Sequence, residues 1–311
     1  MKLRYLLAGL AALSFATAAH ADWQPSGPIK LEIGFDAGGE TDTLGRVIAK
    51  EMEEQTGWDV VAENKPGGGG IAMFTQVAVA KPDGLTIGMG VSMPVLVNLV
   101  LRGDQLPFDL DSFTYLETVA RAQLALVAKS DAPFDDLNGL IEYSKNNEGA
   151  IVAFDAKPQE LLMQYVGQQA GTEFRLLATK SSAEAIQGLL GGHVIAGFAA
   201  GAHIPYLESG DMKMIASANA TRHGYSPDTM TVQEQGYDIY VDPYFYIAAP
   251  AGLPDDAKQA LSAALNAAIN SDAAKRAIVN ALKTDPSDLG PDGTRKMMDE
   301  GLANVSKLFG K

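Results

Sequence analysis

The chain of 311 residues contains no cysteine. This absence excludes disulfide bonds, thiolate metal sites, cysteine nucleophiles and lipid attachment through a cysteine. Basic residues are also scarce, because 24 Lys and Arg stand against 38 Asp and Glu and give a formal charge of -14. Binding to nucleic acid or to anionic lipid requires a basic face. The composition therefore argues against both kinds of partner.

The sequence also lacks the short signatures of common catalytic and metal sites. Ser92 lies in Gly-Val-Ser-Met-Pro, which has no closing glycine of a nucleophile elbow, and neither HExxH nor an EF-hand loop occurs. His193 and His203 are a possible zinc pair, but we interpret them, with His223, as polar loop residues. We predict no catalytic residue, no metal and no cofactor, although sequence alone does not exclude an enzyme.

The first 21 residues have the pattern of a secretory signal peptide. Lys2 and Arg4 precede an uncharged apolar stretch over 6–19, and Ala19-His20-Ala21 has small residues where signal peptidase cleaves. Fourteen apolar residues are too few to span a bilayer, which needs about 20. Cleavage after Ala21 would leave 290 residues with 22 basic and 38 acidic groups, a charge of -16. We expect an exported protein without a lipid anchor, free in the periplasm; a buried N-terminal helix is the alternative.

A second uncharged stretch, 84–101, contains Gly88, Gly90 and Pro94 and would form a poor membrane helix. The pattern favours a buried strand over 85–91, followed by a helix with Pro94 in its first turn. Elsewhere, short apolar strands alternate with helical patterns, which is typical of sheets covered by helices on both faces. The other strands are expected at 30–35, 59–63, 150–154, 174–178, 193–199 and 212–218.

Two long segments, 113–128 and 238–249, are rich in β-forming residues and lack a helical period. We expect the first to be a strand that crosses between two lobes. After Pro250 the pattern is helical, with an apolar stripe from Ala257 to Ala268 and further helices over 272–282 and 292–308. The fold class is therefore α/β, with two lobes built on mixed, mostly parallel sheets and joined by two crossover segments.

Glycine contributes 32 residues, and the excess is clustered. Phe35-Asp-Ala-Gly-Gly-Glu-Thr-Asp42 connects an expected strand to a helix, and Asn64-Lys-Pro-Gly-Gly-Gly-Gly70 connects the next pair. Adjacent glycines let backbone N–H groups approach a ligand, and a helix N-terminus favours an anion. Alternatively, the first loop is a plain turn with Thr41 as the helix cap, and the second is a flexible connection. Because parallel strands end at one edge, both loops and the Ser92 turn should lie together there.

These clusters also carry a family resemblance. The runs over 34–46, 61–70 and 81–86, with Gly-Leu-Leu-Gly-Gly-His-Val at 188–194, Glu-Gln-Gly-Tyr at 234–237 and Ala-Pro-Ala-Gly-Leu-Pro at 249–254, resemble the Bug (TctC-like) family. Its members are periplasmic solute receptors of tripartite tricarboxylate transporters. The resemblance runs in order along nearly the whole chain after residue 21.

The resemblance implies a type II periplasmic binding protein, a Venus flytrap whose lobes close on a small carboxylate. It implies that the loop over 37–42 and the loop after Phe154 hold one carboxyl group, mainly through backbone groups and waters. We expect lobe 1 to comprise 22–122 and 248–311, and lobe 2 to comprise 123–247. The expected ligand-binding residues are Phe35, Ala37, Gly38, Gly39, Thr41, Asp42, Asn64, Gly68, Ser92, Asp155, Ala156, Lys157, Gly201 and Tyr244.

The chain departs from the family in lobe 2. After the strand over 150–154, family members commonly have small residues and Ser, whereas this chain has Asp155-Ala-Lys157. Lys157 or Lys180 is a candidate partner for a second ligand carboxylate, and Asp155 for a ligand amine or hydroxyl. Alternatively, these are surface lysines and a helix-capping aspartate. Tyr244 to Tyr246 offer either an aromatic wall or hinge packing.

The resulting hypothesis is a monomeric receptor for a small organic carboxylate. The resemblance implies delivery to a membrane permease with a large and a small subunit. A sensory protein that presents its ligand to a membrane sensor kinase is the alternative, and an exported enzyme on the same scaffold is a third. The sequence does not identify the acid.

Overall fold

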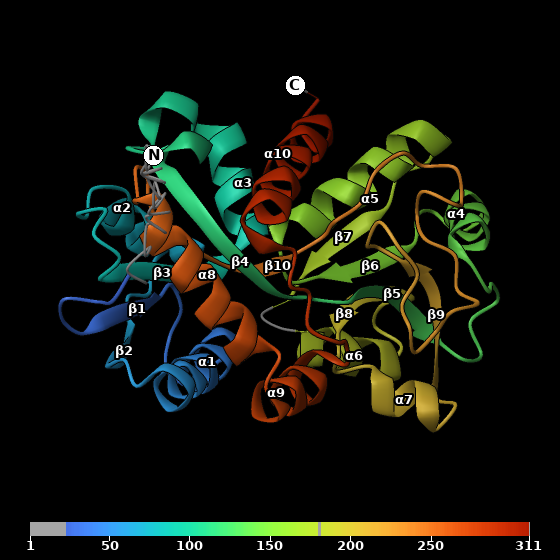
Figure 1. Cartoon of the computed structure of the whole chain (residues 1–311). Coiled ribbons are helices and arrows are strands. Elements are labelled where there is room, and N and C mark those ends of the chain that lie inside the picture. The colour runs from blue at the N-terminus through green and yellow to red at the C-terminus, as the bar shows by residue number, and fades with distance from the viewer. Residues whose placement is uncertain (1–22, 180–181, 311) are drawn as a thin grey trace, which may run out of the picture.

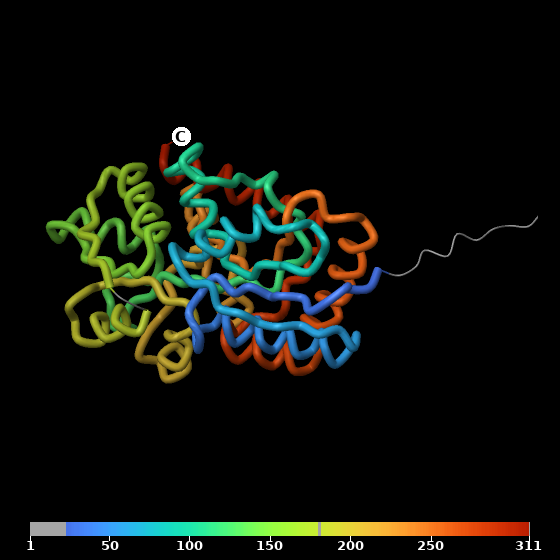
Figure 2. Tube along the Cα trace, turned by 90° about the vertical axis from the view of Figure 1, so that its left-hand side faces the viewer, coloured from blue at the N-terminus to red at the C-terminus, as the bar shows by residue number. Residues whose placement is uncertain are grey.

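The computed structural model describes residues 23–179 and 182–310, so the predicted signal peptide and Lys180 lie outside the described residues. The chain forms two lobes, which Figures 1 and 2 show side by side. The blue and cyan segments and the orange-red C-terminal helices lie in the first lobe, and the yellow segments and an orange loop lie in the second. No helix among the described residues is long and apolar enough to cross a membrane.

The first lobe contains a five-stranded mixed sheet in the order β2-β1-β3-β10-β4. β10 is antiparallel to both neighbours, whereas β1 is parallel to β2 and β3. The strands are β1 (Ile29–Ile33), β2 (Val60–Asn64), β3 (Thr86–Val91), β4 (Phe113–Arg121) and β10 (Tyr244–Pro250).

The second lobe repeats this design in the order β7-β6-β8-β5-β9. Here β5 is the antiparallel strand, paired with β8 and β9, and β6 is parallel to β7 and β8. The strands are β5 (Leu124–Lys129), β6 (Ile151–Phe154), β7 (Arg175–Ala178), β8 (Ala196–Ala200) and β9 (Met212–Ser217). Both sheets are mixed, as the sequence predicts.

Apolar helix stripes cover both faces of the first sheet. Leu44, Ile48 and Met52 of α1 share one core with Leu31 and Ile87 of the sheet, and α8 and α9 complete this layer. The opposite face carries α2, α3 and α10. The helices are α1 (Glu40–Thr56), α2 (Ile71–Ala78), α3 (Ser92–Arg102), α8 (Asp255–Ile269), α9 (Asp272–Leu282) and α10 (Gly290–Leu308).

The second sheet is covered in the same way. Helices α4 (Leu137–Asn146) and α5 (Lys157–Ala170) pack on one face, and α6 (Ser182–Leu190) and α7 (Ile204–Glu208) on the other. The core under α4 and α5 continues into the first lobe through α10, which packs on α3 and β4 and also contacts α5. Figure 1 shows α10 standing between the lobes. The lobes are therefore joined by packing as well as by crossovers.

The expected single strand over 113–128 is instead two strands that belong to different sheets. β4 ends at Arg121 and β5 begins at Leu124. At the break, the Ala122 N–H donates to the carbonyl of Pro243 and the Leu124 N–H to Oδ1 of Asn219. The second crossover, 238–243, is not a strand, and β10 begins only at Tyr244. Because these amides bond outside the sheet ladders, the chain turns from one sheet into the other.

Candidate functional site

Except in the antiparallel strands β10 and β5, the carboxyl ends of the strands in both sheets point toward the crossovers. In the first sheet, β10 is antiparallel to β3 and β4, so β3 ends at the same edge as β4, which leads into the crossover at Arg121. In the second sheet, Leu124 at the start of β5 pairs with Ala200 at the end of β8. The loops after β1, β2 and β3 therefore lie at the hinge edge of one lobe. The loops after β6 and β8 lie at the hinge edge of the other.

The first glycine loop is held in shape by the carboxylate of Asp42. Its Oδ2 accepts from the Gly38 N–H at 2.9 Å, and its Oδ1 accepts from Asn64 Nδ2 at 2.8 Å and from Arg46 Nε at 2.8 Å. Asn64 Nδ2 also donates to the Phe35 carbonyl at 3.0 Å. Asp42 and Asn64, both predicted ligand residues, are thus brought together, and their side chains bond to the loop.

Burial raises the pKa of Asp42, but the hydrogen bonds from Gly38 and Asn64 and the charge of Arg46 outweigh it and hold the pKa below its ordinary value. Thr41 lies inside the first turn and is buried, so the alternative that Thr41 caps α1 is wrong. Gly39 is the N-cap, with no side-chain capping bond among the described residues. Ala37, Gly38 and Gly39 are exposed. The helix therefore begins with backbone N–H groups that no side chain covers.

The second glycine cluster is packed within its own lobe. Gly67 to Gly70 all have positive φ, which glycine adopts without a steric penalty. A Cβ on Gly69 would lie 2.6 Å from Cβ of Pro94 in α3, and a Cβ on Gly34 would lie 2.8 Å from Cα of Gly70. Because these glycines lack a Cβ, the loops after β1 and β2 and the start of α3 can lie close to one another. Gly68, a member of the cluster, is exposed.

Ser92 and Tyr244 both lie at the hinge. Ser92 is fully buried, and its Oγ accepts from the Tyr244 N–H at 3.0 Å. Phe245 and Tyr246 are buried in the core on opposite faces of the sheet, so packing accounts for these two aromatic residues. The half-buried Tyr244 alone of the three lines a cavity, and it remains a candidate for ligand contact.

In the second lobe, the predicted residues precede or begin α5. Asp155 Oδ1 accepts from Gln159 Nε2 at 2.7 Å, and its Oδ2 from Ser182 Oγ at 3.0 Å. The N-cap of α5 is Ala156, so the alternative that Asp155 caps the helix is wrong. Lys157 is exposed and lies 2.8 Å from Oε2 of Glu160. Its ammonium is therefore accessible but already paired.

Gly201 lies where the two lobes meet. Its φ is +85°, and an added Cβ would lie 3.6 Å from the carbonyl of Ala281 in α9. Helix α9 belongs to the first lobe, whereas Gly201 follows β8 of the second. This glycine therefore lies against the opposite lobe.

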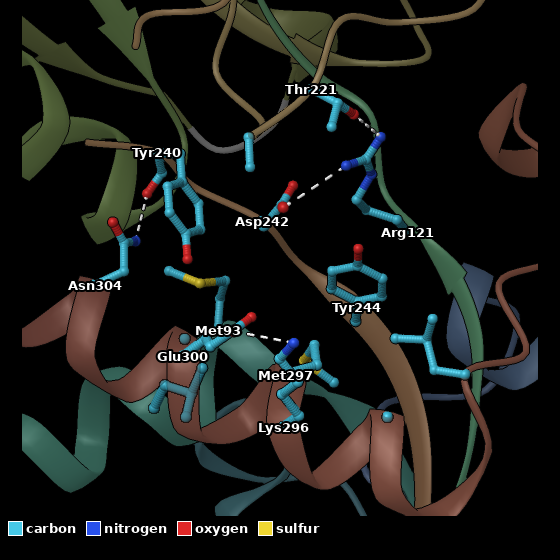
Figure 3. Close-up of a pocket in the computed structure, with 15 residues that line it drawn as sticks. Met93, Arg121, Thr221, Tyr240, Asp242, Tyr244, Lys296, Met297, Glu300 and Asn304 are labelled. Atoms are coloured by element: carbon cyan, nitrogen blue, oxygen red, sulfur yellow. Dashed lines mark hydrogen bonds and ion pairs between the residues drawn. The ribbon is translucent and has the colours of Figure 1, made fainter. Parts of the chain in front are cut away.

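A cavity of about 360 Å³ lies between α10 and the crossovers (Figure 3). Tyr244 is the one predicted ligand residue among those that line it. Arg121 bridges the crossovers beside this cavity, with Nη2 2.6 Å from Thr221 Oγ1 and Nη1 3.7 Å from Asp242 Oδ2. Burial raises the pKa of Asp242, and the Arg121 charge opposes this. No residue of the two glycine loops or of the loop after β6 lines this cavity, which therefore lies at the hinge and apart from the predicted loops.

All three histidines lie outside the helices and strands, as interpreted, but they differ in burial. His203 and His223 are fully buried, and only His193 is exposed. Tyr225 Oη lies 2.9 Å from His203 Nε2 and 2.7 Å from His223 Nδ1, and His223 Nε2 lies 2.7 Å from Asn219 Oδ1. Because Oδ1 only accepts, His223 donates from Nε2 and Tyr225 donates to its Nδ1. In the part of the chain that the structure describes, no group of three or more His, Cys, Asp or Glu could hold a metal.

Sequence reasoning missed three residues that organise this region. Arg46 and Gln159 each lie four residues after a predicted site aspartate on a helix or at its start, and that spacing was the available signal. Asn219 is fully buried and bonds to both crossovers. No local pattern marked it, because its partners on the two crossovers lie 95 and 97 residues before it and 22 and 23 residues after it.

Comparison with known proteins places this architecture in a family. Residues 44–309 match the family TctC, described as the tripartite tricarboxylate transporter family receptor. The UPF0065 protein in the gbd 5′ region of Cupriavidus necator is 30% identical, over 84% of this chain and 80% of that protein. BugT of Bordetella pertussis is 29% identical, over 92% of this chain and 89% of BugT.

Solved structures of low sequence identity share the fold. A TctC solute-binding protein from Polaromonas without ligand has a TM-score of 0.82 at 20% identity, covering 92% of this chain and 99% of its own. MatC of Rhodopseudomonas palustris with bound malate has a TM-score of 0.69 at 23% identity, over 92% and 99%. A second R. palustris protein with adipate has a TM-score of 0.70 at 24% identity, over 92% and 98%.

These structures confirm the predicted fold, a two-lobed α/β binding protein. The family match spans most of the chain, and a relative at 30% identity covers more than two thirds of it. Together they show that this protein belongs to the TctC family of tripartite tricarboxylate transporter receptors, which are Bug-type solute-binding proteins.

Proposed function

We propose that this protein is a periplasmic receptor that captures a small organic carboxylate between its lobes. The observation that carries the proposal is the start of α1. This helix of 17 residues begins at an exposed Gly38-Gly39 pair, and no described side chain caps it. The N–H groups of Gly38 and Gly39 are bonded to Asp42 and to the Asp36 carbonyl, but those of the first helical turn have no capping side chain. Together with the positive end of the helix dipole, these first-turn N–H groups favour a carboxylate there. The fixed loop would bind without a large ordering cost, because Asp42 already holds it.

The second lobe would complete the site with the loop after β6. Asp155, Ala156 and Lys157 lie at the hinge edge of that lobe, as the first glycine loop does in the other. Structural neighbours that bind malate and adipate support a dicarboxylate as the ligand class. On this proposal Lys157 would leave Glu160 and pair with the second carboxylate. The net charge of -14 does not oppose this, because local N–H groups determine the potential inside a cleft.

The binding proposal is tested by isothermal titration with a panel of mono-, di- and tricarboxylates, checked by thermal melting. A true ligand stabilises the folded protein by mass action and therefore raises its melting temperature. The gain in stability is about 2.7 kcal/mol at a ligand concentration of 100 times Kd. We expect at least one acid to bind in the titration and to raise the melting temperature. If none binds and the purified protein turns over a small substrate, the receptor proposal fails.

We further propose that the protein is exported, acts as a monomer and delivers its ligand to the large and small subunits of a membrane permease. Membership of the receptor family supports the partner. N-terminal sequencing of the mature protein should find Asp22 first. Deletion of the membrane subunits should stop uptake of the ligand while leaving its binding to the purified receptor unchanged. Uptake that persists without them would contradict this role and favour sensing.

A further inference from the structure

The loop after β6 in the second lobe is bonded to the side chain of Gln159. Its Oε1 accepts from the Asp155 N–H at 2.9 Å, and its Nε2 donates to Asp155 Oδ1 at 2.7 Å. Gln159 is only 5% exposed. Because the N–H group only donates and the carboxylate only accepts, the two partners fix the orientation of the amide. A side chain at this position must therefore supply one acceptor and one donor.

The glycine loop of the first lobe is held in a corresponding way. Asp42 is the third residue of α1, and Gln159 is the third residue of α5. Each side chain accepts a bond from the N–H of the residue just before its helix N-cap, which is Gly38 in one lobe and Asp155 in the other, and both distances are 2.9 Å. Neither N-cap residue forms a side-chain capping bond. The two lobes thus fix corresponding loops by the same bond.

The two lobes differ in the charge of the side chain that makes this bond. In the first lobe it is the carboxylate of Asp42, which Arg46 pairs with. In the second lobe it is a neutral amide, and the carboxylate that it contacts belongs to Asp155. A second bond to Asp155, from Ser182 Oγ at 3.0 Å, connects the loop to the start of α6. Gln159 therefore holds the loop without adding negative charge beside an anionic ligand.

We propose that Gln159 is a positioning residue of the receptor site, which keeps the loop after β6 in its binding conformation as Asp42 keeps the glycine loop. The inference rests on the proposed function, because it assigns Gln159 to the carboxylate site between the lobes. A loop that is ordered before binding loses less conformational entropy when the ligand arrives. Gln159 acts on the loop and not on the ligand, so its loss should weaken mono- and dicarboxylates by the same factor. Loss of Lys157 should instead affect mainly dicarboxylates.

The first test is isothermal titration of Gln159→Ala with malate and adipate as dicarboxylates and butyrate as a monocarboxylate, within the panel that tests the proposed function. We expect every acid that binds the wild type to be weakened by about 10-fold. Gln164→Ala is the matched control, because Gln164 makes the same kind of bond, to Glu160 four residues earlier, on the exposed surface of α5. It should bind as the wild type does. Urea unfolding establishes that both variants are folded under the titration conditions.

The second test is the pH profile of Gln159→Glu, which keeps the acceptor for the Asp155 N–H but loses the donor to the Asp155 carboxylate. At about pH 8 the two carboxylates repel each other, and binding should be about 10-fold weaker than in the wild type at the same pH. At about pH 5.5 a proton shared by the pair restores the donor, so the affinity relative to the wild type should recover. Gln168→Glu adds the same charge to exposed α5 surface and should show no such recovery.

The outcomes separate this inference from the proposed function. Wild-type affinity in folded Gln159→Ala protein would overturn the positioning role and leave the receptor proposal standing. Selective weakening of dicarboxylates in Gln159→Ala would also overturn it, and so would a Gln159→Glu affinity that does not recover as the pH falls. A wild-type protein that binds no acid of the panel would overturn both proposals.

Discussion

On the proposed function, Asp42 would serve the carboxylate site by holding the glycine loop and not by contacting the ligand. Its carboxylate receives bonds from Gly38, Asn64 and Arg46, so its acceptor capacity is largely used inside the loop. A negative group next to a carboxylate site would normally repel the ligand. Here the Arg46 charge offsets it, and the bonds fix the loop that offers the N–H groups. We infer a positioning role for Asp42 and Asn64.

At Gly39, we predict that Gly39→Val abolishes carboxylate binding and leaves the fold intact. The residue has φ -81°, and an added Cβ would meet only the Asp36 carbonyl, at 3.5 Å. Valine is a poorer N-cap than glycine, which costs about 1 kcal/mol or less. The bulk would, however, block approach to the backbone. Isothermal titration and urea unfolding measure the two effects.

The matched control is Gly27→Val, at the opposite end of β1, where an added Cβ would lie 4.0 Å from Leu85. It should bind normally. A folded Gly39→Val protein with wild-type affinity would show that the carboxylate lies elsewhere.

For Lys157, we predict that Lys157→Ala weakens dicarboxylates by about 10-fold or more and monocarboxylates little. A hydrogen bond between charged groups contributes about 1.5–3 kcal/mol, and only a second carboxylate would lose it. Lys145→Ala is the control, because Lys145 forms the same i,i+3 pair with Glu142 in α4 of the same lobe. Equal weakening of both ligand classes, measured by titration, would remove the proposed role of Lys157.

At the scale of elements, one buried amide bonds to both crossovers. Asn219 Oδ1 accepts from Leu124 N–H and His223 Nε2, and its Nδ2 donates to Ala122 O, Val241 O and Asp242 Oδ1. One side chain thus bonds to both connections between the lobes. The strand break at Ala122, which sequence periodicity did not reveal, is where this side chain binds.

We therefore predict that Asn219→Ala lowers the free energy of unfolding by about 3 kcal/mol or more. The substitution leaves several buried donors and acceptors without partners at once. Urea unfolding at neutral pH measures the change. Asn146→Ala, which removes a single exposed amide bond to Glu142 O, should change stability by about 0.5 kcal/mol or less. A similarly small loss for Asn219→Ala would show that the crossovers do not depend on it.

At the scale of the whole molecule, buried histidines should make stability depend on pH. Burial lowers the pKa of His203 from 6.5 to about 4, and burial, with the charges of His203 and Arg121, lowers that of His223 to about 3. Below pH 6.5 the unfolded chain binds protons that the folded chain does not. Stability is therefore fully present above pH 6.5 and is lost as pH falls toward 4 and then 3.

We predict that His203→Gln loses less stability than the wild type between pH 7 and pH 4.5, by about 1–3 kcal/mol. Glutamine can still donate to Tyr225 but does not titrate in this range. His193→Gln, at an exposed position, is the control and should follow the wild-type profile. Urea unfolding at the two pH values measures the effect. Parallel losses in wild type and His203→Gln would contradict it.

Local sequence pattern is enough to predict the α/β class, most strands and helices, and the loops that connect them at one sheet edge. These features follow from local periodicity and glycine placement, which act over a few residues. The sequence runs that contain the clustered glycines also resemble the Bug (TctC-like) family, and the comparisons confirm that the chain belongs to it. The division of the chain into lobes at particular residues and the ligand contacts remain predictions.

The tertiary structure, in contrast, sets which polar groups are available for binding and which are already bonded. It buried Ser92 and two histidines, paired Lys157 with Glu160, and placed Asn219 between the crossovers. It also left Gln123 unpaired at the hinge. Hydrogen-bond partners distant in sequence are set by how the two sheets pack and where the chain crosses between them. A local sequence pattern carries no information about contacts between residues far apart in the chain, so a buried amide and an exposed one look alike in the sequence.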